Sequence, residues 1–122
     1  MLFTIGYQNL KTAQNLIDIL KSHGIDSLVD VRSKPGGRNA AFRKTHLRKV
    51  LPAAGIAYIW AGRKLGGFGT IEEADIRSLC NWQKSRRACL MCMEADPDRC
   101  HRKNEIGRRS EKYGVKATHI RT

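Results

Sequence analysis

The chain has 122 residues, of which 23 are Lys or Arg and 11 are Asp or Glu, so its formal net charge is +12. This length fits one domain over residues 1–122. The chain has no apolar run long enough for a membrane span and no signal-peptide pattern at its start, so we expect a cytoplasmic protein without a membrane partner. The positive charge favours an anionic partner, either a nucleic acid or a phosphorylated small molecule, although a solubilising basic surface has the same composition. The oligomeric state stays open.

Apolar runs of strand length alternate with segments of helical periodicity in the first half of the chain. Residues 2–6 predict a buried strand, and residues 12–24 predict a helix that ends at a glycine. Residues 26–32 predict the second strand, which leads into a loop broken by one proline and two glycines. A helix follows from about 42 to 51, and residues 56–60 predict the third strand.

The second half repeats this alternation. Thr70 and Glu73 form a capping-box pattern, which predicts a helix that starts there. Residues 88–93 predict a fourth strand, a helix follows from Cys100 to Gly114, and residues 115–120 predict a fifth strand. The whole pattern predicts the α/β class, specifically a single-domain, Rossmann-like three-layer sandwich with a mostly parallel sheet of about five strands.

Reactive side chains follow the second and fourth predicted strands. In parallel sheets, ligands bind at the carboxyl ends of the strands. Asp30 and Glu94 are therefore candidates for a general acid and a general base, and Arg32 is a candidate for holding a phosphate. An alternative is that Asp30 forms a structural ion pair with Arg32 or Arg102 that holds the strand ends together.

The cysteines permit three interpretations. In an extended strand Cys89 and Cys92 point to opposite faces, which weakens a redox pair made from this CxxC motif. A structural zinc site at Cys89, Cys92, Cys100 and His101 is a minor alternative, because adjacent residues seldom bind one tetrahedral ion together. We predict no cofactor, and we expect Cys80 and Cys89 to be packed, reduced thiols.

The third interpretation is an anion site at the start of the fourth helix. Asp96 or Asp98 is a candidate cap, which places Cys100, His101 and Arg102 in the first helical turn. Free backbone N–H groups and the positive end of the helix dipole favour an anion there. A solvated cationic helix surface is the competing interpretation.

Five motifs resemble, in order and spacing, those of the domain of unknown function 488 family: TIGY (4–7), LVDVRSKPGGR (28–38), GIAYIWAGRKLGG (55–67), LMCMEADPDRCHR (90–102) and the terminal HI (119–120). The resemblance implies a small Rossmann-like domain and brings no settled activity. Tyr7 stands where the family often has His, and Cys89 lies outside the family pattern. The matching positions are Thr4, Gly6, Asp30, Arg32, Pro35, Arg38, Tyr58, Leu65, Gly66, Gly67, Cys92, Glu94, Cys100, His101 and Arg102.

These residues favour an enzyme that acts on a phosphate-bearing substrate, of hydrolase or glycosidase type. A non-catalytic nucleic-acid-binding module is the main alternative, because the basic helices suffice to follow a phosphate backbone. A structural zinc-binding protein is the third. For the enzyme, the candidate catalytic residues are Asp30, Glu94, Cys92, Cys100 and His101, and the candidate phosphate-binding residues are Arg32, Arg38, Arg102, Thr4, Gly6, Gly66 and Gly67.

Overall fold

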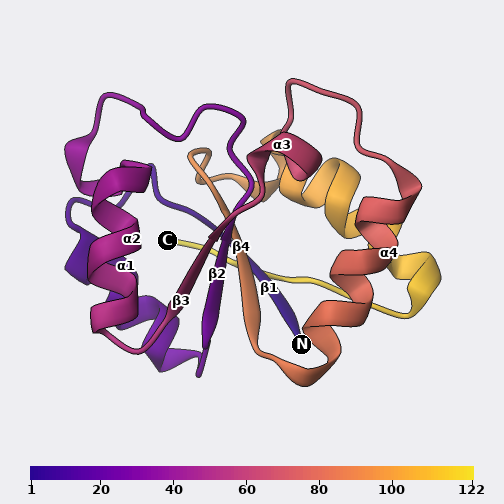
Figure 1. The fold of residues 1–122 in the computed structure, drawn as a ribbon, viewed down its shortest axis with the longest axis horizontal. Helices are drawn as coiled ribbons and strands as arrows, with labels where there is room; N and C mark the ends of the chain where they lie inside the picture. Colours follow the sequence, from indigo (N-terminus) through magenta and orange to yellow (C-terminus); the bar gives the residue numbers. More distant parts are fainter.

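The computed structural model describes residues 1–122, which form one five-stranded sheet with the spatial order β3-β2-β4-β1-β5 (Figure 1). Every neighbouring pair of strands is parallel. The predicted α/β class with about five strands is confirmed, and the sheet is parallel throughout. β4 lies between β1 and β2, which are consecutive in the sequence. The strands are β1 (Leu2–Gly6), β2 (Ser27–Asp30), β3 (Ala57–Trp60), β4 (Ala88–Cys92) and β5 (Thr118–Ile120).

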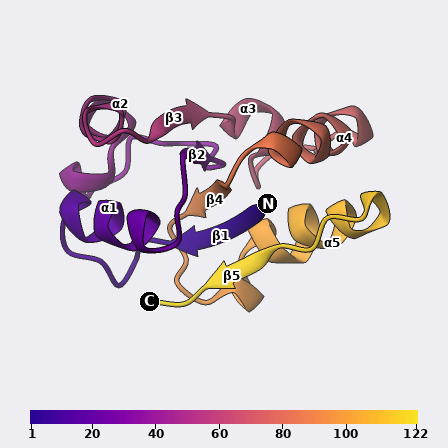
Figure 2. The ribbon, with the colours of Figure 1, turned by 90° about the horizontal axis from the view of Figure 1, so that it is seen from below.

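Helices cover both faces of the sheet (Figure 2). α1 (Ala13–Ser22) and α2 (Lys44–Ala53) lie on one face, whereas α4 (Glu73–Trp82) and α5 (Arg108–Ser110) lie on the other. The short helix α3 (Gly62–Leu65) follows β3 directly. A π-helical segment precedes α5, and no helix is both long and apolar enough to cross a membrane. The remaining turns are 3-10 helices at Ala40–Phe42, Gln83–Ser85, Pro97–Arg99 and Glu111–Tyr113.

α1 shows how local sequence signals produce these elements. Thr12 is its N-cap: the Thr12 hydroxyl accepts from the Asn15 backbone N–H at 3.1 Å, and the Asn15 side chain accepts from the Thr12 N–H at 3.3 Å. Its buried residues recur at helical spacing and pack on the sheet. The helix ends just before Gly24, whose φ of 66° suits glycine. The buried residues of α1 are Ala13, Leu16, Ile17 and Leu20.

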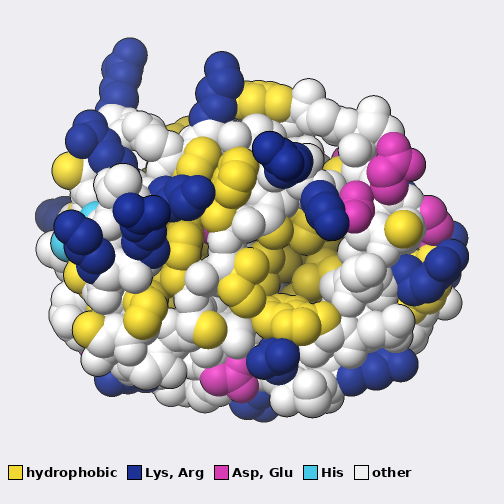
Figure 3. Space-filling model, viewed as in Figure 1, with side chains coloured by type: hydrophobic (Ala, Val, Ile, Leu, Met, Phe, Trp, Pro, Cys, Tyr) yellow, Lys and Arg dark blue, Asp and Glu magenta, His cyan; other side chains and the backbone are white.

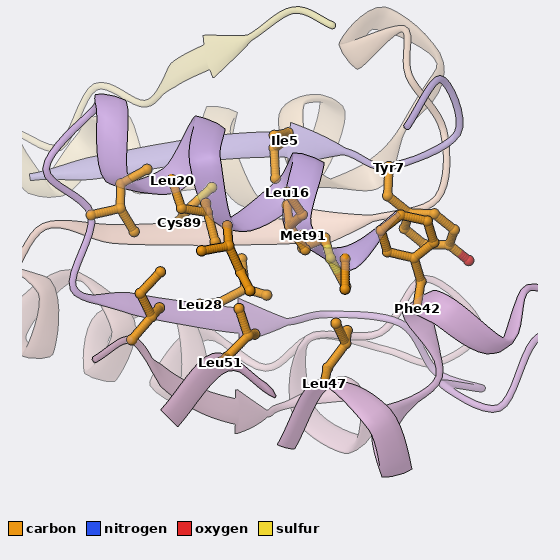
Figure 4. Close-up of a cluster of buried hydrophobic side chains, with 14 of the residues drawn as sticks. Ile5, Tyr7, Leu16, Leu20, Leu28, Phe42, Leu47, Leu51, Cys89 and Met91 are labelled. Atoms are coloured by element: carbon orange, nitrogen blue, oxygen red, sulfur yellow. The ribbon is translucent and has the colours of Figure 1, made fainter. Parts of the chain in front are cut away.

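Alternation along β4 divides its side chains between two hydrophobic cores. Cys89 and Met91 enter the core under α1 and α2, in which the rings of Tyr7 and Phe42 stack with centroids 4.5 Å apart (Figure 4). Cys92 enters the core under α4 and α5. The prediction that Cys89 and Cys92 face opposite sides of the sheet is therefore confirmed.

The predicted start of α4 is wrong. The helix begins at Glu73, and its N-cap is Glu72, which makes no side-chain capping bond. The Glu73 carboxylate instead binds Lys112 and the hydroxyl of Tyr113, which lie near the C-terminal end of the chain. A tertiary contact has therefore replaced the local capping box that Thr70 and Glu73 predicted.

Candidate functional site

A carboxylate, a guanidinium and two phenols, one of them half-buried, form a cluster at the carboxyl edge of the sheet. Asp30 is fully buried and binds Arg32 in a bidentate ion pair, with Arg32 Nε 2.8 Å from Oδ1 and Arg32 Nη2 2.7 Å from Oδ2. Oδ1 also accepts from the Arg32 backbone N–H, and Oδ2 accepts from the Tyr58 hydroxyl at 2.5 Å. Arg32 Nη1 donates to the Tyr7 hydroxyl at 3.2 Å. We call these four residues the carboxylate cluster.

The carboxylate cluster is suited to holding the strand ends rather than to proton transfer. Burial and the neighbouring Asp30 carboxylate raise the pKa of Tyr58, so its hydroxyl remains a hydrogen-bond donor. Burial disfavours the charge on Arg32, but the Asp30 carboxylate more than offsets this and raises the guanidinium pKa. Both oxygens of Asp30 are engaged, which favours the structural alternative for Asp30 and Arg32 over acid–base and phosphate-binding roles.

Arg102 is the centre of a second buried cluster, which lies on the other face of the sheet. Its side chain is fully buried, and Nε donates to the Thr4 hydroxyl at 3.2 Å. Nη1 donates to Cys92 Sγ at 2.8 Å and to the Glu94 carbonyl at 2.6 Å, whereas Nη2 donates to the Ala95 carbonyl at 3.3 Å. The guanidinium is thus occupied within the protein, which argues against the predicted contact of Arg102 with a substrate phosphate.

Thr4 connects Arg102 to His119 on the edge strand β5. The register of β1 and β5 places Thr4 beside His119, and Thr4 Oγ1 lies 2.6 Å from His119 Nδ1. Because the Thr4 hydroxyl accepts from Arg102, it is free to donate its own proton to His119. Burial and the nearby Arg102 lower the pKa of His119, which favours the neutral ring that accepts this bond. The Thr4 hydroxyl is therefore engaged on both sides, which argues against its predicted anion-binding role.

The pKa values of Cys92 and Cys100 are shifted in opposite directions. The interaction between the two side chains lowers the pKa of Cys100 and, together with burial, raises that of Cys92, whose thiol donates to the Glu94 carbonyl at 3.8 Å. Burial opposes the charge on Cys100, but the His101 ring and the backbone N–H of Arg102 also stabilise it. The pKa of Cys100 is therefore lowered to about 4, well below that of an ordinary thiol, whereas that of Cys92 is raised.

His101 completes this group, and its pKa is raised. Its Nδ1 lies 3.7 Å from Cys100 Sγ, and its Nε2 donates to the Leu65 carbonyl at 2.9 Å. Burial disfavours a charged ring, but the Cys100 thiolate and the carbonyls of Leu65 and Val31 raise the pKa of His101. Gly67 passes close to the ring, where a Cβ would lie 3.2 Å from Nδ1. We call Thr4, Cys92, Cys100, His101, Arg102 and His119 the thiolate cluster.

The helical segment that the sequence predicts from Cys100 to Gly114 starts later than predicted. Asp96 caps the 3-10 turn Pro97–Arg99, and Cys100 is extended with φ −129° and ψ 143°. The helix begins at Arg102 with six residues of π-helix, a form that often occurs at functional sites. The backbone N–H groups of Lys103 and Asn104 donate to the Cys100 carbonyl at 3.2 and 3.1 Å. Cys100 and His101 therefore precede the helix whose first turn was predicted to hold an anion.

The glycines predicted to bind an anion serve close packing. A Cβ on Gly6 would lie 1.8 Å from the Glu94 carbonyl oxygen, and one on Gly66 would lie 2.1 Å from Ser33 Oγ. The Glu94 carboxylate accepts from the Asp96 backbone N–H at 3.2 Å and makes no contact with Asp30. The acid and base predicted at Asp30 and Glu94 are therefore not brought together as a pair.

The structure separates the predicted pocket into two clusters on opposite faces of the sheet. The Asp30 side chain points to the same face of the sheet as that of Leu28, two residues earlier, which is the face under α1 and α2. Cys92 belongs to the core under α4 and α5. Cys89 is fully buried on the Asp30 side, where burial raises the pKa of its thiol. The four residues of the zinc alternative are therefore not gathered, and no group of three or more His, Cys, Asp or Glu is placed to hold a metal ion.

Sequence reasoning named most of the thiolate cluster but missed His119. The signal was present in the terminal motif, since the β1–β5 pairing that brings His119 to Thr4 joins the first and last motifs of the chain. Tyr7 was singled out only as a departure from the family pattern, yet it binds Arg32. Arg38, by contrast, is exposed, and its side chain has no hydrogen-bond or ion-pair partner.

An open apolar groove lies on the same face as the thiolate cluster. It runs between β3, α3 and α4, and Figure 3 shows it as a hollow with an apolar floor near the centre of the view. Leu65 lines this groove, and its carbonyl binds His101. The groove and the thiolate cluster are therefore neighbours. Other apolar groove residues are Val29, Ile59, Ala61, Leu79 and Trp82.

The fold and the two clusters define a small, parallel α/β protein with a cysteine of lowered pKa near the carboxyl edge of its sheet. A family model described as "Domain of unknown function DUF488" matches residues 12–74, more than half of the chain. The chain belongs to the DUF488 family. Neither the curated proteins nor the solved structures contain a match. The matched region includes Asp30, Arg32 and the glycine loop, whereas residues 92–102 of the thiolate cluster lie beyond it.

Proposed function

We propose that this protein is an enzyme that acts on a phosphate-bearing substrate, a nucleic acid or a nucleotide, through a covalent intermediate on Cys100. The observation that carries the proposal is the contact of Cys100 Sγ with His101 Nδ1 at 3.7 Å. A thiolate beside a cationic imidazole is the arrangement of an activated cysteine nucleophile. The pair also lies at the sheet edge at which parallel α/β proteins bind their ligands.

The proposed reaction is a hydrolysis in two steps. Cys100 Sγ attacks an electrophilic centre of the substrate, which is phosphorus for a phosphoester and the anomeric carbon for a nucleoside. The bond from this centre to the leaving group breaks, and the leaving group takes the proton from His101 Nδ1. Water then gives a proton back to His101, attacks the covalent intermediate and releases the Cys100 thiolate. Hydrolase and glycosidase chemistry share these steps.

The distribution of charge supports an anionic substrate. Residues 33–71 contain no Asp or Glu, and none of their Lys and Arg side chains forms an ion pair. Figure 3 shows Lys and Arg side chains over α2 and along the edge of the molecule that carries the loop after β2. Such an unpaired basic surface attracts polyanions. Its cations are Lys34, Arg38, Arg43, Lys44, Arg48, Lys49, Arg63 and Lys64.

An exposed aromatic ring supports a substrate that contains a base. The Phe68 side chain is 81% exposed, and the ammonium of Lys34 lies 5.8 Å from the centre of its ring. Both residues belong to loops that follow β2 and α3 at the carboxyl edge. A ring beside a cation is suited to stacking a base next to its phosphate. The proposal also places the enzyme in the cytoplasm, where thiols stay reduced.

The test is a comparison of substrate turnover by wild type and by Cys100→Ser. Both proteins are incubated with nucleotides and with plain and base-modified oligonucleotides, and released base, phosphate or nucleotide is measured by chromatography. We expect Cys100→Ser to lower the rate by at least about 100-fold, because its hydroxyl is not ionised. Cys89→Ser is the matched control, since Cys89 lies in the other core, and it should retain the rate. Equal rates for wild type and Cys100→Ser would contradict the proposal.

The second candidate function is a non-catalytic nucleic-acid-binding module, and the unpaired cations of α2 favour it. Arg48 and Lys49 are exposed on this helix without acidic partners. Fluorescence anisotropy with labelled oligonucleotides at several salt concentrations tests it. The double variant Arg48→Glu with Lys49→Glu should weaken binding at least about tenfold and flatten the salt dependence. Lys84→Glu with Lys116→Glu changes the net charge equally and should leave affinity within about threefold, whereas equal losses would indicate only a general field effect.

A further inference from the structure

Cys92 and Cys100 come from different elements but meet at one point. Cys92 is the last residue of β4, and Cys100 follows the 3-10 turn that leads into the fourth helix. Both side chains belong to the core under α4 and α5, where they influence each other's pKa, and the guanidinium of Arg102, two residues after Cys100, binds Cys92 Sγ at 2.8 Å. Both residues are buried but not completely, since Cys92 is 5% exposed and Cys100 is 7% exposed. A nucleophilic sulfur therefore has a second thiol as its direct neighbour.

We propose that Cys92 and Cys100 form a reversible disulfide when the protein meets a hydroperoxide, with Cys100 as the attacking sulfur and Cys92 as the resolving one. The chemistry needs only the two thiols and the oxidant. Its consequence rests on the proposed function, because a disulfide consumes the nucleophile and so switches the enzyme off. The thiols that the sequence suggested as a redox pair, Cys89 and Cys92, are on opposite faces and cannot join.

The oxidation takes place in two balanced steps. The Cys100 thiolate attacks one peroxide oxygen, the O–O bond breaks, and the leaving oxygen takes a proton from His101 to form water or an alcohol. This leaves a sulfenic acid on Cys100, which has lost two electrons to the peroxide. The Cys92 sulfur then attacks Cys100 Sγ, and the S–O bond breaks. The departing hydroxyl group takes the Cys92 proton and leaves as water. Two electrons from an added dithiol restore both thiols.

The surroundings select this pair over the other cysteines and select a small oxidant. Cys89 is fully buried among apolar side chains, and Cys80 is 1% exposed with its thiol directed at the Ser110 carbonyl. Thiolate character and access decide which thiol reacts with peroxide, and only Cys100 has both. Closing the bond requires the sulfurs to approach to about 2.05 Å. The intervening segment 93–99 is mostly exposed or half-buried, which permits this adjustment.

The experiment treats reduced full-length protein with one to ten equivalents of hydrogen peroxide and counts thiols after denaturation. We expect the four free thiols to fall to two, the mass to fall by about 2 Da, and a peptide map to link Cys92 to Cys100. Dithiothreitol should restore all four thiols. Loss of Cys80 or Cys89 at a comparable rate, or a wild type that accumulates sulfenic acid without a disulfide, would overturn the proposal.

Variants assign the two roles. Cys92→Ser should stop at the sulfenic acid, which the reagent dimedone traps on Cys100, whereas Cys100→Ser should lose no thiol over the same time. Cys89→Ser is the matched control and should form the disulfide like wild type. Disulfide formation at the wild-type rate in Cys92→Ser would refute the pairing. Thermal unfolding and circular dichroism of each variant identify any that fails to fold, and Cys92→Ala then replaces Cys92→Ser.

The two proposals fail separately. The thiol count uses no substrate, so a protein that forms the disulfide but turns over no substrate retains the redox pair and loses the proposed enzyme activity. A protein whose turnover depends on Cys100 but that forms no disulfide loses the redox pair alone. If both hold, peroxide should lower turnover in parallel with disulfide formation, and dithiothreitol should restore it.

Discussion

Replacing Asp30 by Asn tests whether the carboxylate cluster is structural. Asp30 accepts four hydrogen bonds, three from Arg32 and one from Tyr58. An amide reproduces the size of the carboxylate but not its charge, and its NH2 group faces donors wherever it is placed. The Arg32 guanidinium, which is 8% exposed, then has no counter-charge. The expected result is a large loss of stability that does not depend on any substrate.

The magnitude follows from the burial of the pair. Removing one partner of a buried ion pair costs about 3–5 kcal/mol, because the remaining charge is uncompensated. Domains of this kind have a free energy of unfolding of about 5–15 kcal/mol, so the change removes a large share of it. With a urea slope of about 1.5–2 kcal/mol per molar, a cost of about 4 kcal/mol shifts the unfolding midpoint down by about 2–3 M.

The assay is urea unfolding followed by circular dichroism, with wild type and Asp30→Asn at the same protein concentration and pH. Asp26→Asn is the matched control: Asp26 lies next to the opposite end of β2, is exposed and accepts from the Arg87 backbone N–H at 3.1 Å. We expect the control to cost about 1 kcal/mol or less. If Asp30→Asn costs no more than the control, the structural account of the cluster is wrong.

Three further predictions concern the thiolate cluster and its supports. Gly6→Ala should lower the free energy of unfolding in urea by about 3 kcal/mol, because its Cβ would lie 1.8 Å from a backbone oxygen. The control Gly69→Ala has open space around it and should change stability by less than about 0.5 kcal/mol, and similar costs for both variants would contradict the packing account. Thr4→Val should cost about 1–3 kcal/mol, because Arg102 and His119 both lose a buried partner; a neutral result would mean that these groups find other partners. Cys92→Ala should raise the pKa of Cys100, because the side chain that lowers this pKa is removed, and the pH midpoint for alkylation by iodoacetamide should rise with it. In wild type, alkylation should persist as the pH falls well below the range in which an ordinary thiol protonates. An unchanged midpoint in the variant would refute the effect of Cys92 on Cys100.

The sequence predicts the fold class well, because alternating strand and helix patterns with short connections allow few arrangements. The opposite orientation of Cys89 and Cys92 follows from the two-residue period of a strand alone, and it holds. The residues at the strand ends were also predictable, since parallel strands place their carboxyl ends at one edge.

The assignment of those residues to one pocket was not predictable in the same way. Whether Asp30 and Cys92 share a face depends on where each strand ends and how its neighbours are ordered, and the sequence shows neither directly. The start of the fourth helix was missed because a 3-10 turn capped by Asp96 has the same sequence signal as a helix. Arg102 was predicted to bind a substrate anion, because Arg is almost never fully buried unless it is paired and the sequence does not show its internal partners.

The position of β4 between β1 and β2 has a consequence for how the chain folds during synthesis. β1 and β2 are complete by residue 30, yet they do not pair with each other. Each pairs with β4, so residues 88–92 must be present before β1 and β2 are joined in the sheet. Only β2 and β3 can pair earlier. Such long-range pairing slows folding, because the chain loses the entropy of closing a long loop before the strand contacts that offset this loss have formed. A ribosome-bound chain that ends before β4 should therefore expose an unpaired β1, and limited proteolysis of nascent chains of increasing length should show protection of β1 arising only once β4 has emerged.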